Sequence, residues 1–320
     1  MNTPDNINWF LIAMNAINGI VIFLFGVSNM SDGLNEIGSD KMKRLLAKTT
    51  NNIFAGILVG TIVTTILDAS SATIMMVIAM VNAKLLTSRQ SFGIILGSNI
   101  GTTIGCQIIA YDVGEYSAIP LFLGFIIFLA AKAEKTKQIG KSILGIGLIF
   151  FGLNYISQSV ELLRDLPSFT NLMTKIENPY WGALTGAIAT FIFQSSSAMI
   201  GITLAIANQG LITLPGAVSV MLGAEIATCS NTLLASIGRS RDAIRAGVFH
   251  LLFNIITVIV GLILINPLIH LVTIVSGEGS LARQIANAHV LFNILGVLLF
   301  VGFIPLLSKM LFNLIPDKKI

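Results

Sequence analysis

The sequence predicts an all-α polytopic membrane protein with two inverted-topology repeats, each containing a re-entrant helical hairpin. The first observation is composition: 11% of the 320 residues are charged, 54% are hydrophobic, and the mean hydropathy is +0.87. About a quarter of the residues of a soluble domain are charged, and a disordered chain has low hydrophobicity, so both classes are excluded. The second observation is an internal repeat, and the third is an uneven distribution of Lys and Arg between loops.

Seven apolar segments are candidates to span the roughly 30 Å of membrane hydrocarbon. They are residues 9–27, 91–110, 117–132, 142–156, 216–236, 246–272 and 285–308. We expect Asn266–Pro267 to break or end the 246–272 helix, because proline removes a helix hydrogen bond. The N-terminus has no basic cluster and no small-residue cleavage site, so 9–27 is interpreted as a first span and not a signal peptide. Residues 31–48 are predicted to form an amphipathic interfacial helix, with a solvated loop as the alternative.

Two further apolar stretches, 53–83 and 179–209, are interrupted near their middle by polar residues. The interruptions are Asp68-Ala69-Ser70-Ser71 and Gln194-Ser195-Ser196-Ser197. Each half is too short to span the hydrocarbon. We therefore predict re-entrant hairpins with polar tips at mid-depth, where irregular backbone is tolerated inside protein or along a cavity. One long tilted span with a Ser-rich kink is the alternative.

The two stretches are copies of one another. Across residues 52–107, 19 of 56 positions are identical to the residue 126 positions later, without a gap. Matched groups include Gly56-x-x-x-Gly60 with Gly182-x-x-x-Gly186, and Ser70-Ser71-Ala72 with Ser196-Ser197-Ala198. Three predicted crossings separate equivalent points, and an odd number means that the second copy enters from the opposite side. Many transporters have such inverted repeats, with the binding site at the midplane between them.

These features divide the chain into three parts. The first inverted repeat is 1–133 with hairpin 53–83, the second is 134–241 with hairpin 179–209, and the membrane helices of 242–320 complete the domain. If the N-terminus lies outside, 16 of the 19 Lys and Arg residues lie inside, and Arg164, Lys175 and Arg283 lie outside. A single crossing by 53–83 would nearly abolish this bias. We therefore predict a multi-pass protein of the cell inner (plasma) membrane, with the N-terminus outside and the C-terminus cytoplasmic.

The hairpin tips are predicted to bind an anion. A helix that begins at mid-membrane presents unpaired N–H groups and the positive end of its dipole, and serines there add hydroxyl donors. The candidate substrate-binding residues are Ser70, Ser71, Gln194, Ser195, Ser196 and Ser197. Two such helix ends meeting on a pseudo-two-fold axis would surround a small tetrahedral oxyanion. The alternative is that the serines only cap broken helices.

A second pair of segments, 97–103 and 223–229, combines small residues with oxygen-bearing side chains suited to Na⁺. Its candidates are Asn99, Thr102, Thr103, Glu225 and Thr228, to which Asp68 is added. Asp68 and Glu225 are the only acidic residues in the apolar segments, where a carboxylate by default marks an ion or proton pathway. The alternative is that either carboxylate is protonated and hydrogen-bonded.

The motifs QSSSA at Gln194–Ala198 and GSNIGTT at Gly97–Thr103, in this duplicated arrangement, resemble the type II sodium-dependent phosphate cotransporter family (bacterial Na/Pi cotransporter). The resemblance covers about residues 15–310. It implies Na⁺-coupled symport of inorganic phosphate by alternating access, with phosphate and sodium sites at the QSSS hairpins. It also adds Gln194 and Asn231 to the sodium ligands. Bacterial relatives carry a soluble helical domain after the last span, and with a sequence ending at Ile320 we expect none here.

Two departures from the family pattern leave alternatives open. The first motif reads DASS and the second segment GAEIATC, so each copy has gained a carboxylate. The alternatives are a transporter or exporter of another small anion with Na⁺ or H⁺ coupling, and an anion channel. An enzyme is not expected, because no Ser–His spacing supplies the base that a serine nucleophile needs.

The remaining expectations concern isolated residues and partners. His250 and His289 are interpreted as polar contacts between helices, with a proton relay as the alternative. Cys106 and Cys229 are expected to be buried packing residues. The expected partners are inorganic phosphate, Na⁺ and the lipid bilayer, with no nucleic acid and no cofactor besides Na⁺ as coupling ion. A homodimer is left open.

Overall fold

The computed structural model describes residues 9–48, 52–111, 114–164 and 166–317, and these contain helices but no strand. The first half contains α1 (Trp9–Ala47), α2 (Ile53–Leu67), α3 (Ser70–Asn82), α4 (Ser88–Gly101), α5 (Thr103–Ile109), η2 (Gly114–Tyr116), α6 (Ala118–Ala130) and α7 (Glu134–Glu161). The second contains α8 (Pro167–Ile176), α9 (Pro179–Phe193), α10 (Ser196–Asn208), α11 (Leu214–Ala227), α12 (Cys229–Ser236), α13 (Arg241–Ile263), α14 (Ile265–Ser276), α15 (Leu281–Val301) and α16 (Ile304–Leu314).

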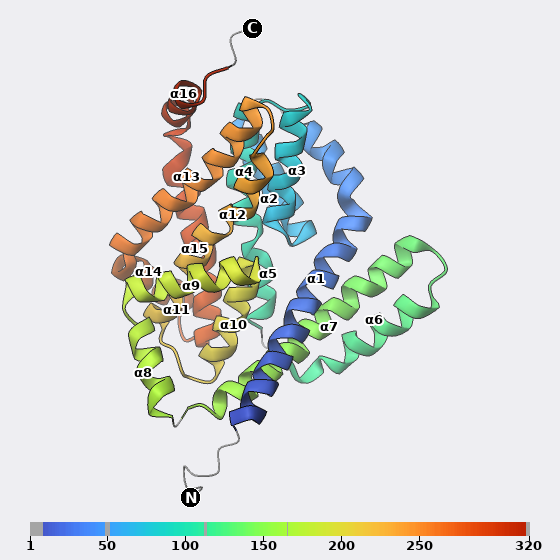
Figure 1. Ribbon diagram of the computed structural model, residues 1–320, viewed down its shortest axis with the longest axis vertical. Helices are drawn as coiled ribbons and strands as arrows, with labels where there is room; N and C mark the ends of the chain where they lie inside the picture. Colours follow the sequence, from blue (N-terminus) through green and yellow to red (C-terminus); the bar gives the residue numbers. More distant parts are fainter. Residues whose placement is uncertain (1–8, 49–51, 112–113, 165, 318–320) are drawn as a thin grey trace, which may run out of the picture.

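Six helical segments of the described chain are long and apolar enough to cross a membrane. They are Phe10–Ala47, Ser88–Ile109, Glu134–Glu161, Leu214–Ser236, Arg241–Ile263 and Leu281–Val301. The expectation of an all-helical, multi-pass membrane protein is therefore confirmed. The described chain starts and finishes at opposite ends of the molecule (Figure 1). The predictions for the N-terminal residues 1–8 and for Lys318 and Lys319 fall outside the described residues.

Helices α1 and α7 pack against each other through glycines that let the backbones touch. A Cβ added at any of four glycines would lie under 3.0 Å from a backbone nitrogen of the partner helix. The pairs are Gly19 with Ile156, Gly26 with Ile149, Gly145 with Met30, and Gly152 with Phe23. Numbers rise along α1 as they fall along α7, so the helices are antiparallel. The contacts also exchange under a shift of 126 residues, so the interface is self-complementary, as across a two-fold axis.

Helices α2, α3 and α4 recur as α9, α10 and α11 with boundaries 126 residues further on. The predicted interruptions are confirmed as breaks. Asp68 and Gln194 end α2 and α9 in the left-handed region, at φ 47° and 57°, and an extended residue follows each of them. The copies therefore share the same local construction, down to Asn52 and Asn178, which cap α2 and α9 through their side chains.

Helices α2 and α4 are parallel, so α3, which connects them, runs in the opposite direction. Added Cβ atoms at Gly93, Gly97 and Gly101 of α4 would overlap the carbonyl oxygens of Ile53, Ile57 and Thr61 of α2. Both series advance by four residues, so the two helices run in the same direction. The chain must therefore return through α3 before α4 begins. In the second copy, Gly223 of α11 packs against the Ala183 carbonyl of α9 in the same way.

Several predicted boundaries are wrong. The separate interfacial helix at 31–48 does not exist, because α1 continues unbroken from Trp9 to Ala47. No proline interrupts this range, and Gly33 lies inside the helix, where it packs against Ser142 of α7. The segment predicted as span 117–132 is α6, with 13 helical residues. The break expected at Asn266–Pro267 occurs at Leu264, so that Asn266 and Pro267 lie in the first turn of α14.

Three other predicted spans are also interrupted, whereas 142–156 lies within the continuous helix α7. The 91–110 and 216–236 segments divide at Thr102 and Thr228, and 285–308 divides at Gly302–Phe303. Each of the first two breaks is a single residue in helical conformation. Chain direction is therefore nearly kept there, unlike at Asp68 and Gln194.

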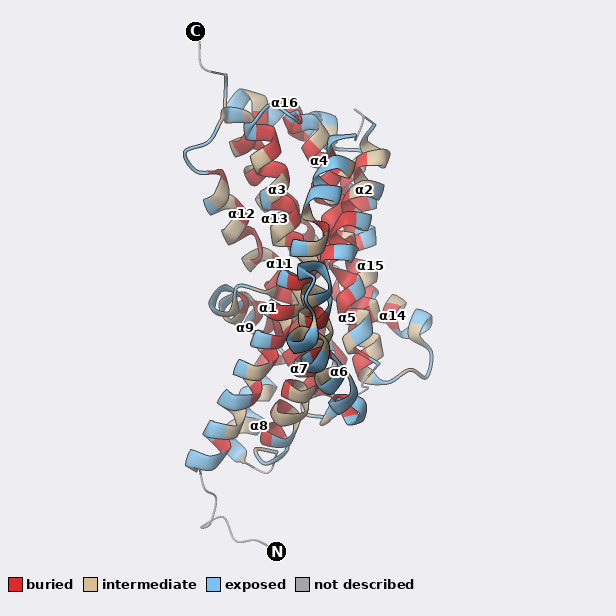
Figure 2. Ribbon diagram, turned by 90° about the vertical axis from the view of Figure 1, so that its right-hand side faces the viewer, coloured by how far each residue is buried: buried red, intermediate tan, exposed pale blue. Residues whose placement is uncertain are grey.

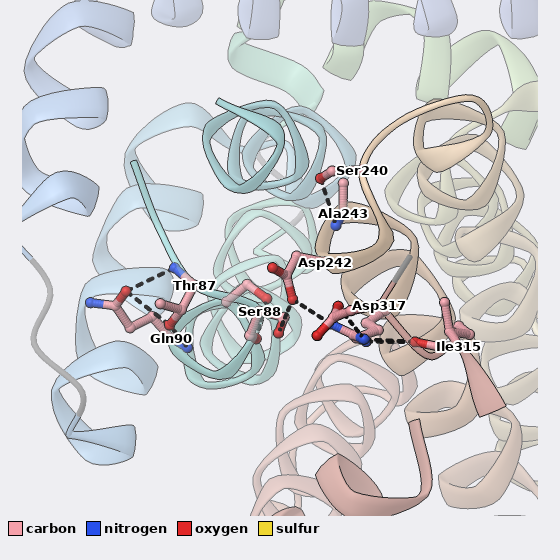
Figure 3. Close-up of polar contacts among 10 residues, drawn as sticks. Thr87, Ser88, Gln90, Ser240, Asp242, Ala243, Ile315 and Asp317 are labelled. Atoms are coloured by element: carbon pink, nitrogen blue, oxygen red, sulfur yellow. Dashed lines mark hydrogen bonds and ion pairs between the residues drawn. The ribbon is translucent and has the colours of Figure 1, made fainter. Parts of the chain in front are cut away.

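Figure 2 shows buried residues concentrated in α3, α4, α13 and α15, whereas α6 and α8 are mostly exposed or half-buried. At the end where α4 and α13 begin, Arg245 is 1% exposed. Its guanidinium donates to Asp242 at 2.8 Å, to Asp317 at 2.7 Å and to the Ile315 carbonyl. Asp242 also accepts from Ser88 (Figure 3). This cluster fixes the segment after α16 to the starts of α4 and α13.

Candidate functional site

A cavity of about 280 Å³ brings the two interrupted tips together. All six predicted substrate-binding residues line it: Ser70, Ser71, Gln194, Ser195, Ser196 and Ser197. Four of the predicted cation-binding residues do so as well: Asp68, Thr102, Gln194 and Thr228. The cavity thus lies where α3 and α10 begin and where α4 and α11 end. Five pairs of residues 126 positions apart occur in its lining.

The two tips differ in how their helix ends are satisfied. In the second copy, Ser195 caps α10 by accepting from the Ala198 N–H at 3.1 Å, and the Gln194 amide donates to the Phe191 carbonyl at the end of α9. In the first copy, Ala69 gives α3 no side-chain cap, and a carboxylate at position 68 cannot donate to a carbonyl when ionised. The helix-cap alternative therefore holds for Ser195. Among the described residues, no side chain at the N-cap position satisfies the first N–H groups of α3.

A second difference between the copies leaves room for the Asp68 carboxylate. It packs directly against Gly105, where an added Cβ would overlap Asp68 Oδ1. In the other copy, the positions of Asp68 and Gly105 are occupied by Gln194 and Asn231. Asp68 also borders a second, mostly apolar cavity of about 180 Å³.

Helix α1 supplies a third wall that the sequence analysis missed. Its lining residues are Leu24, Val27, Ser28, Ser31 and Asp32. Their spacing of i, i+3, i+4, i+7 and i+8 is that of one helix face. The sequence therefore contained this helical spacing, but Ser28, Ser31 and Asp32 lie beyond residue 27, where the predicted first span ended.

Four predicted cation-binding residues do not line the cavity. Asn99, Thr103 and Glu225 are buried, and Asn231 is half-buried on α12. The Asn99 amide donates to the Ile95 carbonyl at 2.9 Å, and the Thr103 hydroxyl to the Ile100 carbonyl at 2.8 Å. Asn99 and Glu225 lie three residues before Thr102 and Thr228, so they lie about one helical turn from the cavity.

The Glu225 carboxylate is paired with His289, which joins α11 to α15. Oε1 of Glu225 lies 2.7 Å from Nε2 of His289, and the two side chains are 3% and 0% exposed. Nδ1 of His289 has no hydrogen-bond partner among the described residues. The interpretation of His289 as a polar contact between helices agrees with this geometry.

A second buried group links α11, α12 and α13. Nδ1 of His250 lies 2.7 Å from the Thr232 hydroxyl, and the Asn254 amide donates to the Glu225 carbonyl at 2.9 Å. Cys229 lies in this group, and both cysteines are buried and free, as expected. These contacts hold the end of α11 in place behind the cavity.

The charge of the cavity wall constrains what it can bind. Asp32 and Asp68 are acidic, and no Lys or Arg occurs among the described residues that line it. The described residues also contain no group of three His, Cys, Asp or Glu side chains that could hold a metal ion. The available chemistry is hydroxyl and backbone N–H donors for an anion, with carboxylate, amide and hydroxyl oxygens for a monovalent cation.

The sequence pattern of the Na⁺/Pi-cotransporter family matches residues 22–158 and 165–303. The chain belongs to this family. Bacillus subtilis YqeW, an uncharacterized protein, is 31% identical over 309 residues, which cover 96% of this chain and 99% of YqeW. YjbB of Escherichia coli strain K12, whose name proposes inorganic phosphate export, is 24% identical over 311 residues. That alignment covers 96% of this chain but 56% of YjbB, so the chain spans little more than half of that relative.

Human sodium-dependent phosphate transport protein 2B is 28% identical over 133 residues, which cover 38% of this chain and 19% of that protein. None of the solved structures matches the chain. The resemblance drawn from QSSSA and GSNIGTT is therefore confirmed. The Na⁺/Pi-cotransporter family consists of transporters and not enzymes, and its name points to phosphate and Na⁺ at a membrane.

Proposed function

We propose that this protein is a secondary active transporter of the cell inner membrane that moves inorganic phosphate in symport with Na⁺ by alternating access. One observation carries the proposal: two serine-lined helix starts meet in a cavity whose charged lining residues are Asp32 and Asp68. Helix N-termini and hydroxyls bind an oxyanion, but the carboxylates repel it. A cation at Asp68 removes that repulsion, so anion and cation bind best together. Such mutual dependence is what a symporter needs.

The proposed roles follow the cavity lining. Phosphate is bound by Ser70 and Ser71 from one tip and by the Gln194–Ser197 segment from the other. Na⁺ is bound by the oxygens of Asp68, Thr102, Gln194 and Thr228. Asn99, Thr103, Glu225 and Asn231 would reach a cation after the helices rearrange around it, as alternating access requires.

We further propose that the copies are inverted in the membrane and that each helix–break–helix unit is re-entrant. The equivalent helices α1 and α7 run antiparallel, which supports inversion of one copy relative to the other. The return of α3 alongside α2 and α4 supports a hairpin that enters and leaves on one side. We place the N-terminus outside and the C-terminus in the cytoplasm, from the distribution of Lys and Arg. The repeats are 1–133 and 134–241, completed by 242–320.

The test is flux of radioactive phosphate into proteoliposomes containing the purified protein, with an inward Na⁺ gradient or with choline in its place. We expect uptake only with Na⁺. Ser196→Ala should lower uptake about 10- to 100-fold, because a hydrogen bond to a charged group contributes about 1.5–3 kcal/mol. Ser159→Ala is the matched control, since this buried hydroxyl donates to the Tyr155 carbonyl away from the cavity. Equal uptake in Na⁺ and choline would refute Na⁺ coupling.

A second candidate is phosphate export with Na⁺ or H⁺ as the coupling ion. It is favoured by the relation to YjbB, whose name proposes export and which aligns with 96% of this chain. Proteoliposomes loaded with phosphate distinguish the two. Efflux driven by an imposed Na⁺ or pH gradient, without Na⁺-driven uptake, would favour export.

A further inference from the structure

Asp32 and Lys141 form an ion pair beside the cavity. Lys141 Nζ on α7 lies 3.3 Å from Asp32 Oδ2 on α1, and Asp32 lines the cavity. The Ser28 hydroxyl, also on the cavity wall, donates to the same oxygen at 3.4 Å. The side chains of Lys141 and Asp32 are 25% and 60% exposed. The pair thus lies at an edge of the cavity where both side chains are partly exposed, and this edge is called the mouth below.

The neighbouring residues fix the position of this pair. Gly33 follows Asp32 and Ser142 follows Lys141, and an added Cβ at Gly33 would overlap Ser142 Oγ. The two helix backbones therefore touch one residue beyond the ion pair. An exposed ion pair adds little to stability, and the glycine contact already joins α1 to α7. A packing role does not account for the charges.

The pair is present at one of two equivalent places. Because α1 and α7 are copies, the positions matching Asp32 and Lys141 are Gln158 and Asn15. Those two residues are neutral, although the antiparallel contact between the helices is self-complementary. The charges therefore occur at only one of the two equivalent places along the contact between α1 and α7.

Lys141 compensates the negative charge that Asp32 adds to the cavity wall. Without Lys141, Asp32 would place an uncompensated carboxylate on the path of an anion. We propose that Asp32 and Lys141 form an exchange pair, in which Lys141 leaves Asp32 for phosphate as the anion passes the mouth. Ser28 then holds the released carboxylate. This inference rests on the proposed function and adds two positioning residues to it.

The test measures KM and kcat for phosphate flux in Lys141→Gln, Asp32→Asn and the double variant. At separations of several ångströms in a solvated mouth, one unit charge acting on phosphate changes KM by about threefold to tenfold. We expect Lys141→Gln to raise KM and Asp32→Asn to lower it. The double variant should return close to the wild-type value, because both charges are removed. kcat should change less than KM.

Two controls separate this electrostatic effect from damage to the fold. Lys43→Gln removes the cation from an exposed pair on α1, the helix of Asp32. Lys43 lies 3.6 Å from Asp40 and away from the cavity lining, so this variant should leave KM unchanged. Raising ionic strength with choline chloride should shrink the differences between variants, because salt screens exposed charges.

The possible failures are distinguishable. One shared KM for all variants, or shifts of both single variants in the same direction, would refute the exchange pair while leaving phosphate transport intact. A wild-type protein that neither transports phosphate nor binds it in calorimetry would instead refute the proposed function, and the exchange pair with it.

Discussion

Replacing His289 by leucine should strongly destabilise the protein, because it leaves the Glu225 carboxylate buried without its partner. Glu225 is 2% exposed and His289 is 0% exposed, and their polar atoms lie 2.7 Å apart. Breaking a buried ion pair by removing one partner costs about 3–5 kcal/mol. At roughly 2 °C per kcal/mol for a chain of this size, the midpoint of thermal unfolding in detergent should fall by about 6–10 °C.

The matched variant removes both polar groups. In His289→Leu with Glu225→Met, no charge remains buried, and replacing both partners by apolar residues is often nearly neutral. We therefore expect the double variant to recover most of the lost stability. A double variant no more stable than His289→Leu would refute the buried-charge reasoning. A fall of only about 2 °C in the single variant would mean that Glu225 is protonated and loses a neutral hydrogen bond of about 1 kcal/mol.

Three further predictions concern packing and helix ends, all measured by thermal unfolding in detergent. Gly97→Leu and Gly223→Leu should abolish the folded protein, because the new side chains would overlap the carbonyls of Ile57 and Ala183. Gly302→Ala should be tolerated, because no atom of the described residues lies within 4 Å of the added Cβ. Ser195→Ala should lower the free energy of unfolding by about 1 kcal/mol, because α10 loses its cap. Ala69→Ser should raise it by a similar amount by giving α3 a cap. If both variants changed the stability in the same direction, the asymmetry of the tips would be contradicted. Arg245→Met should cost about 1–3 kcal/mol and expose the segment after α16 to protease, whereas Asp40→Asn, in an exposed pair, should do neither.

Sequence patterns indicated which residues line the cavity where polar chemistry and repetition coincide. The Ser70–Ser71 and Gln194–Ser197 segments could be found because polar residues interrupt apolar runs, and because the interruption occurs twice at one spacing. The positions of the breaks in α2 and α9 followed for the same reason.

The sequence did not indicate two features of the structure, which are the wall that α1 adds to the cavity and the partner of Glu225. The predicted first span ended at residue 27, but α1 continues to Ala47, so the wall formed by Ser28, Ser31 and Asp32 was lost with the false boundary. Glu225 was grouped with the cation ligands because carboxylates in apolar segments mark ion pathways. Its pairing with His289 joins residues 64 positions apart, and no local pattern indicates such a contact.

Because α2–α4 and α9–α11 are copies 126 residues apart, each position in one copy can be compared with the equivalent position in the other. Any substitution in one tip has a counterpart in the same molecule, at the same expression level and in the same membrane. Exchanging Asp68 with Gln194, and Gly105 with Asn231, would move the extra carboxylate to the other copy without changing the composition of the chain. Comparing fluxes in the two directions before and after that exchange would test the proposal that the two copies are inverted in the membrane.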